Sequence, residues 1–136
     1  MIGILIVSHG ATGTDLLATA AQVLGEQPRQ VLALGVSRDE NPERVLGHAR
    51  ELLPQVDDGA GVLVLTDMFG ATPGNIAVRL LEDGHVEGVA GLSLPMLLRA
   101  LAQREGTLAA TVQRALSGGT EGVLHMNRDR CCDAKR

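Results

Sequence analysis

Residues 2–10 read IGILIVSHG, and this stretch decides the fold. Its first six residues are all apolar or glycine and most are β-branched, which is typical of a strand buried on both of its faces. Such strands occur in parallel sheets that helices cover on both sides. The run ends in a polar Ser-His-Gly, so the sequence predicts a central parallel strand that carries a histidine at its carboxyl end.

The same alternation of apolar strand and amphipathic helix continues along the chain. Four strand–helix units joined by right-handed crossovers predict an α/β fold, a doubly wound sandwich. We expect a parallel sheet of strand order 2-1-3-4, followed by a short C-terminal fifth strand. The predicted strands are residues 2–7, 31–36, 62–65, 86–92 and 122–124, and the predicted helices are residues 14–24, 42–53, 76–81, 95–101 and 108–116.

Length and composition indicate one globular domain. The chain has 136 residues, enough for a single buried core, and its 45% hydrophobic and 21% charged residues are ordinary for such a protein. We expect the domain to span residues 1–127 and a polar tail to span residues 128–136. Two adjacent cysteines in that tail, Cys131 and Cys132, are expected to stay free thiols.

Charge and hydropathy exclude several classes of function. The net charge is −4 at pH 7 and the basic residues before the tail are scattered singly, so the chain lacks the basic patch of a nucleic-acid-binding protein. No apolar run approaches the roughly 18 residues of a membrane-spanning helix. The N-terminus has no basic region of the kind found in secretory signals. We therefore expect a cytoplasmic protein without direct membrane insertion.

The carboxyl ends of the first and third strands are the expected place of the chemistry, because ligands of doubly wound folds bind where the strand order reverses. His9 follows the first strand, and a neutral imidazole can take up a phosphoryl group or ligate a metal. Asp67 follows the third strand, and its carboxylate can bond one ring nitrogen and leave the other free to attack. The alternative for both residues is the capping of an ordinary turn.

The turn after Asp67 has the features of an anion site. Gly70, Ala71 and Thr72 are small residues at the start of a helix, where unpaired N–H groups and the helix dipole favour negative charge. Thr72 adds a hydroxyl donor. A nucleophile, an orienting acid and an anion cradle together predict phosphoryl transfer.

Common phosphate-binding motifs are missing from the sequence. There is no Gly-x-x-x-x-Gly-Lys-Ser/Thr loop, and the single lysine is Lys135 in the tail. The turn after the first strand has no Gly-x-Gly-x-x-Gly, and no carboxylates cluster for magnesium. We therefore expect transfer from one phosphorylated residue to another, without nucleotide, metal or other cofactor.

The other three histidines are weaker candidates. His48 lies in the middle of a predicted helix among polar neighbours. His85 precedes the fourth strand, at the opposite end of the sheet from His9, and His125 follows the last predicted strand. Each of them is expected to have a structural role.

Three motifs, in order and at the right spacing, resemble those of a known family. They are Val-Ser-His-Gly at residues 7–10, Thr-Asp-Met-Phe-Gly-Ala-Thr-Pro-Gly-Asn at residues 66–75, and Gly-Leu-Ser-Leu-Pro-Met-Leu at residues 91–97. Nearly the whole chain resembles the IIA component of the mannose-type phosphoenolpyruvate-dependent sugar phosphotransferase system (PTS). It departs from that family at Ala71, where glycine is usual, and at Ser93, where asparagine is common.

The resemblance implies a phosphohistidine carrier and a role for each matching residue. His9 would accept phosphate from phospho-HPr on Nε2 and pass it to a IIB component, while Asp67 holds Nδ1. The small-residue turn at residues 70–72 would contact the phosphate. The resemblance also implies a homodimer in which the C-terminal strand, residues 122–124, is exchanged between subunits.

An apolar rim beside the site is the expected docking surface. Met68 and Phe69 lie in the loop after the third strand, and Pro95 and Met96 open the helix after the fourth. Phe69 is the only aromatic residue of the chain and would anchor HPr and the acceptor protein. The alternative is that its ring plugs the top of the core.

Two other functions stay open on the sequence alone. A regulatory protein would bind a target according to the phosphorylation state of His9 and would feed no sugar transporter. Some small metal chelatases also begin with a strand that ends in His-Gly. A chelatase needs a second ligand or base in the same crevice, and His85 is expected at the opposite end of the sheet.

Overall fold

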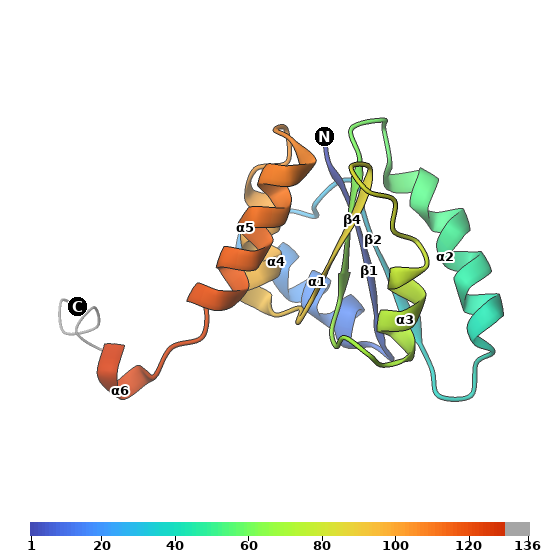
Figure 1. Ribbon diagram of the computed structural model, residues 1–136. Helices are drawn as coiled ribbons and strands as arrows, with labels where there is room; N and C mark the ends of the chain where they lie inside the picture. Colours follow the sequence, from blue (N-terminus) through green and yellow to red (C-terminus); the bar gives the residue numbers. More distant parts are fainter. Residues whose placement is uncertain (130–136) are drawn as a thin grey trace.

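The computed structural model describes residues 1–129 and has a four-stranded parallel sheet between two layers of helices (Figure 1). The strand order is β2-β1-β3-β4, which confirms the predicted doubly wound α/β fold. The strands are β1 (Gly3–His9), β2 (Val31–Val36), β3 (Val62–Thr66) and β4 (Val86–Ala90). The helices are α1 (Thr12–Leu24), α2 (Pro42–Val56), α3 (Thr72–Val78), α4 (Leu94–Ala102), α5 (Leu108–Glu121) and α6 (Met126–Asp129).

The alternation of side chains along the first strand divides the core in two. Ile2, Ile4 and Ile6 pack with α1, α4 and α5, while Leu5 and Val7 pack with α2 and α3. Figure 1 shows these two groups of helices on opposite faces of the sheet. All five side chains are fully buried, as the continuous apolar run predicts.

The register of the sheet places the two predicted functional turns at one edge. The central strand β1 pairs in parallel with β2 and β3, and Val7 lies between Leu34 on one side and Thr66 on the other. The carboxyl ends of β1 and β3 are therefore neighbours. His9 ends β1 and Asp67 directly follows β3, so both lie at the carboxyl edge of the sheet, where doubly wound folds bind their ligands.

Several helix and strand ends differ from the predicted ones. The first helix already begins at Thr12, and α2 continues through Pro54 to Val56. β4 stops at Ala90 rather than at residue 92, because Gly91 has a φ of +91°, outside the β region.

The last long helix does not end at its pair of glycines. α5 continues through Gly118 to Glu121. A Cβ on Gly118 would lie 2.7 Å from Cβ of Arg99 on α4. Because it has no side chain, this glycine permits the close approach of α4 and α5.

The predicted fifth strand at residues 122–124 is not present in the described chain. Gly122 caps the end of α5, and residues 123–125 have no regular structure before α6. Strand backbone needs a neighbouring strand for its hydrogen bonds, and Figure 1 shows α5 leading this segment away from the sheet. Val123 and Leu124 are consequently exposed.

The C-terminal region is described only in part. α6 spans the expected boundary between the domain and its tail, and Cys131 and Cys132 lie outside the described residues. None of the helices found within residues 1–129 is long and apolar enough to cross a membrane.

Candidate functional site

His9 and Asp67 are in direct contact at the carboxyl edge of the sheet. Oδ2 of Asp67 lies 2.9 Å from Nδ1 of His9 and accepts a second hydrogen bond, at 3.1 Å, from the main-chain N–H of His9. Its Oδ1 is buried and accepts no hydrogen bond from the described chain. The His9 side chain is 48% exposed and that of Asp67 only 16%. The ring is therefore open to solvent while its carboxylate partner is largely covered.

Hydrogen bonding sets the charge of Asp67 and, through it, the tautomer of His9. Partial burial by itself would raise the pKa of Asp67, but the hydrogen bonds from the ring and main-chain N–H of His9 outweigh it, and the pKa is lowered. An ionised carboxylate only accepts hydrogen bonds, so Nδ1 must carry the hydrogen. In the neutral ring Nε2 then holds the lone pair, and no described residue hydrogen-bonds to it.

The turn between β1 and α1 is held by contacts that the sequence-based predictions do not include. The buried Ser8 hydroxyl accepts the N–H of Gly13 at 2.8 Å, and the N–H of Gly10 donates to the carbonyl of Val36 at 3.0 Å. A Cβ on Gly35 would lie only 2.1 Å from the carbonyl oxygen of Gly10. The sequence contains one sign of this contact, a lone glycine inside an apolar strand, which often marks a close backbone approach.

The turn after β3 folds back over the start of α3. Gly70 has a φ of +88°, and a Cβ on Gly74 would lie 2.6 Å from the carbonyl oxygen of Met68. Ala71 is the N-cap of α3 and supplies no side-chain acceptor, and Thr72 begins the helix with its side chain exposed. Within residues 1–129 this turn makes no hydrogen bond with the histidine–aspartate pair, although it lies at the same edge of the sheet.

Three of the four residues predicted to form an apolar rim are exposed, and one is buried. Phe69 is 77% exposed and Met68 is 55% exposed, so Phe69 does not plug the core. Pro95 is exposed in the first turn of α4. Met96, however, is only 4% exposed and packs in the core, because it begins the buried face of α4. Its side chain cannot belong to an exposed rim.

The other histidines lie away from the pair at the carboxyl edge. His48 is exposed on α2, and His125 precedes α6, which stands apart from the sandwich in Figure 1. His85 is at the amino edge, where its Nε2 lies 2.7 Å from Oδ2 of Asp57. Among the residues that the structure describes, no three His, Cys, Asp or Glu side chains lie together as potential metal ligands.

Comparison with known proteins relates the chain to one sequence family. The family described as "PTS system fructose IIA component" matches residues 3–116. The mannose-specific EIIAB component of the PTS of Escherichia coli K12 is 36% identical over 125 residues, which are 90% of this chain and 38% of that relative. The fructose-specific EIIA component of Bacillus subtilis is 30% identical over 106 residues, 77% of this chain and 72% of the relative.

A regulator and a solved structure are also similar to the chain. The transcriptional regulatory protein LevR of Bacillus subtilis is 34% identical over 94 residues, 68% of this chain and 9% of that protein. The crystal structure of the PTS component EIIA from Streptococcus agalactiae has a TM-score of 0.83 at 26% identity and covers 94% of this chain and 99% of that chain. The chain thus belongs to the family of PTS IIA components of the mannose and fructose type.

Proposed function

We propose that the protein is a cytoplasmic phosphohistidine carrier, in which His9 accepts a phosphoryl group from phospho-HPr and passes it to a IIB component for sugar uptake. One observation carries the proposal: Oδ2 of Asp67 lies 2.9 Å from Nδ1 of His9. This contact occupies one ring nitrogen and leaves the solvent-exposed ring with a single nucleophilic atom, Nε2. Membership of the PTS IIA family supports the same role.

The transfer needs only a nucleophile, an electrostatic partner and a positioned donor. Nε2 of His9 attacks the phosphorus in line, a new N–P bond forms, and the bond to the donor residue breaks with its electron pair going to the donor. The phosphorylated ring keeps its hydrogen on Nδ1 and gains positive character. The ionised Asp67 stabilises that charge. In the second transfer a nucleophile of the acceptor protein attacks the phosphorus, the N–P bond breaks, and its electron pair returns to Nε2.

We assign the phosphoryl oxygens to the turn after β3. The main-chain N–H groups of Gly70, Ala71 and Thr72 lie at the start of α3, and the cap residue offers them no side-chain acceptor. Free N–H groups in this position favour an anion. The hydroxyl of Thr72 supplies a further donor. Phe69, Met68 and Pro95 are exposed and form the surface on which we expect HPr and the acceptor to dock.

We further propose that the protein is a homodimer. The outer edge of β4 carries only the single bridge between Glu82 and Val86 among the described residues, and an open sheet edge favours pairing with another chain. Residues 122–126 expose three large apolar side chains, Val123, Leu124 and Met126. A segment with no strand partner in its own chain can become a strand on the open edge of a second copy.

The carrier reaction can be tested with the purified phosphotransferase proteins. After incubation with phosphoenolpyruvate, enzyme I and HPr, we expect one acid-labile phosphate per chain by intact mass, and none when HPr is omitted. His9→Ala should abolish the label. His48→Ala, His85→Ala and His125→Ala should retain it. Label that remains on His9→Ala would overturn the site, and an unlabelled wild-type protein in the presence of active HPr would overturn the donor.

A second candidate function is phosphorylation-dependent regulation of a target protein. The 34% identity with the transcriptional regulatory protein LevR favours it. In this case the phosphorylated protein and His9→Ala would retain different partners in a pull-down, and the phosphorylated protein would not pass its label to any IIB component. Rapid loss of label to a IIB component would support the carrier function instead.

A further inference from the structure

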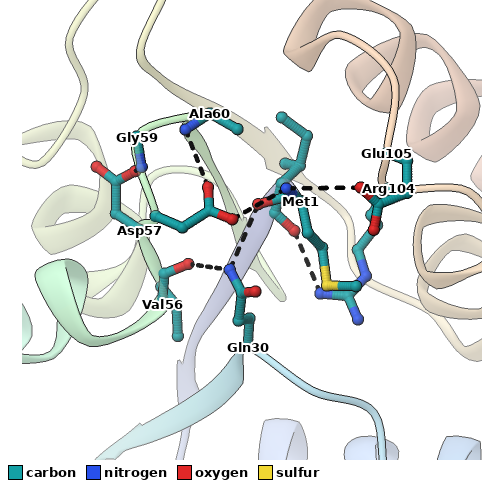
Figure 2. Close-up of polar contacts among 10 residues, drawn as sticks. Met1, Gln30, Val56, Asp57, Gly59, Ala60, Arg104 and Glu105 are labelled. Atoms are coloured by element: carbon teal, nitrogen blue, oxygen red, sulfur yellow. Dashed lines mark hydrogen bonds and ion pairs between the residues drawn. The ribbon is translucent and has the colours of Figure 1, made fainter.

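A cavity of about 720 Å³ opens at the amino edge of the sheet, the edge opposite to His9. Its wall comes from Met1, from the end of α1 with the loop that follows it, from the end of α4 with the loop between α4 and α5, and from one side chain of α5. Figure 2 shows part of this wall, with Arg104 and Glu105 beside Met1. None of these residues takes part in the transfer site.

Three arginines line the cavity, although the protein as a whole is acidic. The lining contains Arg29, Arg104 and Arg114 and two acidic residues, Glu26 and Glu105, while the whole chain has a net charge of −4. The N-terminal ammonium of Met1 also belongs to the lining and lies 3.8 Å from an oxygen of Glu105. None of the three arginines forms an ion pair with a carboxylate of the described chain. Arg79 and Arg99, by contrast, lie 2.7 and 2.9 Å from glutamate oxygens.

Two of the three guanidinium groups are held in the wall by main-chain carbonyls. Arg104 is only 7% exposed; its Nη1 donates to the carbonyl of Ile2 at 3.2 Å, and its buried Nε has no acceptor within residues 1–129. Arg114 donates from Nη2 to the carbonyl of Gln103, and its buried Nε also has no acceptor in the part of the chain that the structure describes. Donors left in this state cost free energy.

The charges around Arg104 also favour an anion. Burial lowers the pKa of its guanidinium; the nearby carboxylate of Glu105 opposes this effect, and the positive charge of Arg29 adds to it. A buried cation beside a second cation is costly unless an opposite charge is close. Glu105 is one such charge, and an anion in the cavity would add a second one that acts on both Arg104 and Arg29.

We propose that this cavity binds a small organic anion with a phosphate or carboxylate head. The planar fork of a guanidinium matches either head, and the head would lie between the three arginines. The rest of the lining includes apolar side chains against which a short carbon body can pack: Leu24, Pro28 and Leu101.

The proposal can be tested by following the amide resonances of the full chain while anions are added. Inorganic phosphate tests the head alone, glycerol 3-phosphate adds a body, and succinate replaces phosphate by carboxylate; glycerol is the uncharged control. We expect saturable shifts of the amides of residues 26–29 and 103–106 with at least one anion, and none with glycerol. No saturable shift there with any of the three anions up to about 10 mM would overturn the proposal.

Substitutions locate the binding site of the anion. Arg104→Gln and Arg114→Gln should each weaken binding about tenfold or more, and Arg29→Gln should weaken it in the same direction. Arg44→Gln removes a charge from the exposed face of α2, outside the cavity, and should leave binding unchanged. Arg104 also supports a main-chain carbonyl, so the exposed Arg29 decides the test if Arg104→Gln does not fold.

The transfer site is itself expected to attract phosphate, and His9→Ala separates the two sites. Binding at residues 26–29 and 103–106 should persist in His9→Ala, whether or not the carrier function is correct. Shifts confined to residues 9 and 67–72 that disappear in His9→Ala would assign the anion to the transfer site and overturn the cavity. Equal affinity of the wild-type protein, Arg29→Gln and Arg114→Gln would overturn it as well.

Discussion

A single carboxylate oxygen organises the proposed transfer site. Oδ2 of Asp67 accepts both the ring N–H and the main-chain N–H of His9. Asp67→Asn keeps the shape but removes the charge, and its amide can donate to Nδ1 and so favour the wrong tautomer. We expect phosphoryl transfer from phospho-HPr to slow about a hundredfold or more, as measured by the rate at which the phosphorylated mass appears. Transfer at the wild-type rate would refute the orienting role of Asp67.

Gly35 fixes how closely β2 approaches the turn that carries His9. A Cβ at this position would lie 2.1 Å from the carbonyl oxygen of Gly10, and a main-chain atom can move away only by shifting the turn. We expect Gly35→Ala to lower the free energy of unfolding by about 1–3 kcal/mol and to slow phosphorylation of His9. Urea unfolding and the transfer rate are the two measurements.

Gly47 offers a matched control for this substitution. It lies inside α2, and a Cβ there would meet no atom within 4 Å. Gly47→Ala should therefore raise the free energy of unfolding, by up to about 1 kcal/mol, and leave transfer unchanged. If both alanine variants behave alike, the close approach at Gly35 does not constrain the turn.

A histidine–aspartate pair joins the end of α2 to the start of β4 at the amino edge of the sheet. Nε2 of His85 lies 2.7 Å from Oδ2 of Asp57. The hydrogen bond and the negative charge of Asp57 raise the pKa of His85. Burial tends to raise the pKa of Asp57, but hydrogen bonds from the N–H of Gly59 and from His85 outweigh it, and the pKa is lowered. The pair therefore makes stability depend on pH.

The direction in which each pKa is shifted gives the pH range in which the pair stabilises the fold. The contribution of His85 is complete below the ordinary histidine pKa of about 6.5 and is lost as the pH rises through the raised value. That of Asp57 is complete above about 3.9 and is lost as the pH falls through the lowered value. His85→Gln should thus lower the melting temperature more at about pH 5.5 than at about pH 8.5.

The exposed His48 on α2 serves as the control for this pair. His48→Gln removes the same kind of side chain, which forms no hydrogen bond or ion pair with a carboxylate among the described residues. Its charge acts on Glu40 only at longer range, so its effect should change between the two pH values by less than that of His85→Gln. An effect of His85→Gln that does not change between the two pH values would contradict a charged pair.

The order of the elements was predictable because helices and strands have different hydrophobic patterns. The residues at which several elements end were not predictable. Proline and glycine often mark the end of a helix, but either residue can also lie inside one. Pro54 stands in the last turn of α2, which continues for two more residues, and Gly118 lies at the close contact of α4 and α5. The strand predicted at residues 122–124 had the right composition but has no neighbouring strand in the described chain.

The contact between His9 and Asp67 was predictable for a different reason. Once the sheet is parallel and the order is 2-1-3-4, the carboxyl ends of strands 1 and 3 must be neighbours. The clearance at Gly35 depends on the exact register of β1 and β2, which apolar periodicity does not determine. The buried face of α4, which includes Met96, and the arginine-lined cavity depend on how distant segments pack, and no local pattern contains that information.

On the scale of the whole molecule, the sandwich holds polar groups at both edges of its sheet and exposes apolar groups at its C-terminal end. His9 is at the carboxyl edge and the arginine cavity at the amino edge. Val123, Leu124 and Met126 are 81, 63 and 75% exposed. Clustered exposed apolar side chains of this size mark interaction surfaces, and a second copy of the chain would bring an open β4 edge for them to cover.

If that segment joins two copies, charge introduced there should separate them. The wild-type protein should scatter light as a dimer, and the double variant Val123→Asp/Leu124→Asp as a single chain of 14.2 kDa, because burying a carboxylate in an apolar contact is costly. Val23→Asp is the matched control, since Val23 is 60% exposed on α1, and it should stay dimeric. A wild-type protein that is monomeric at high micromolar concentration, or a double variant that stays dimeric, would show that residues 122–126 do not hold two copies together.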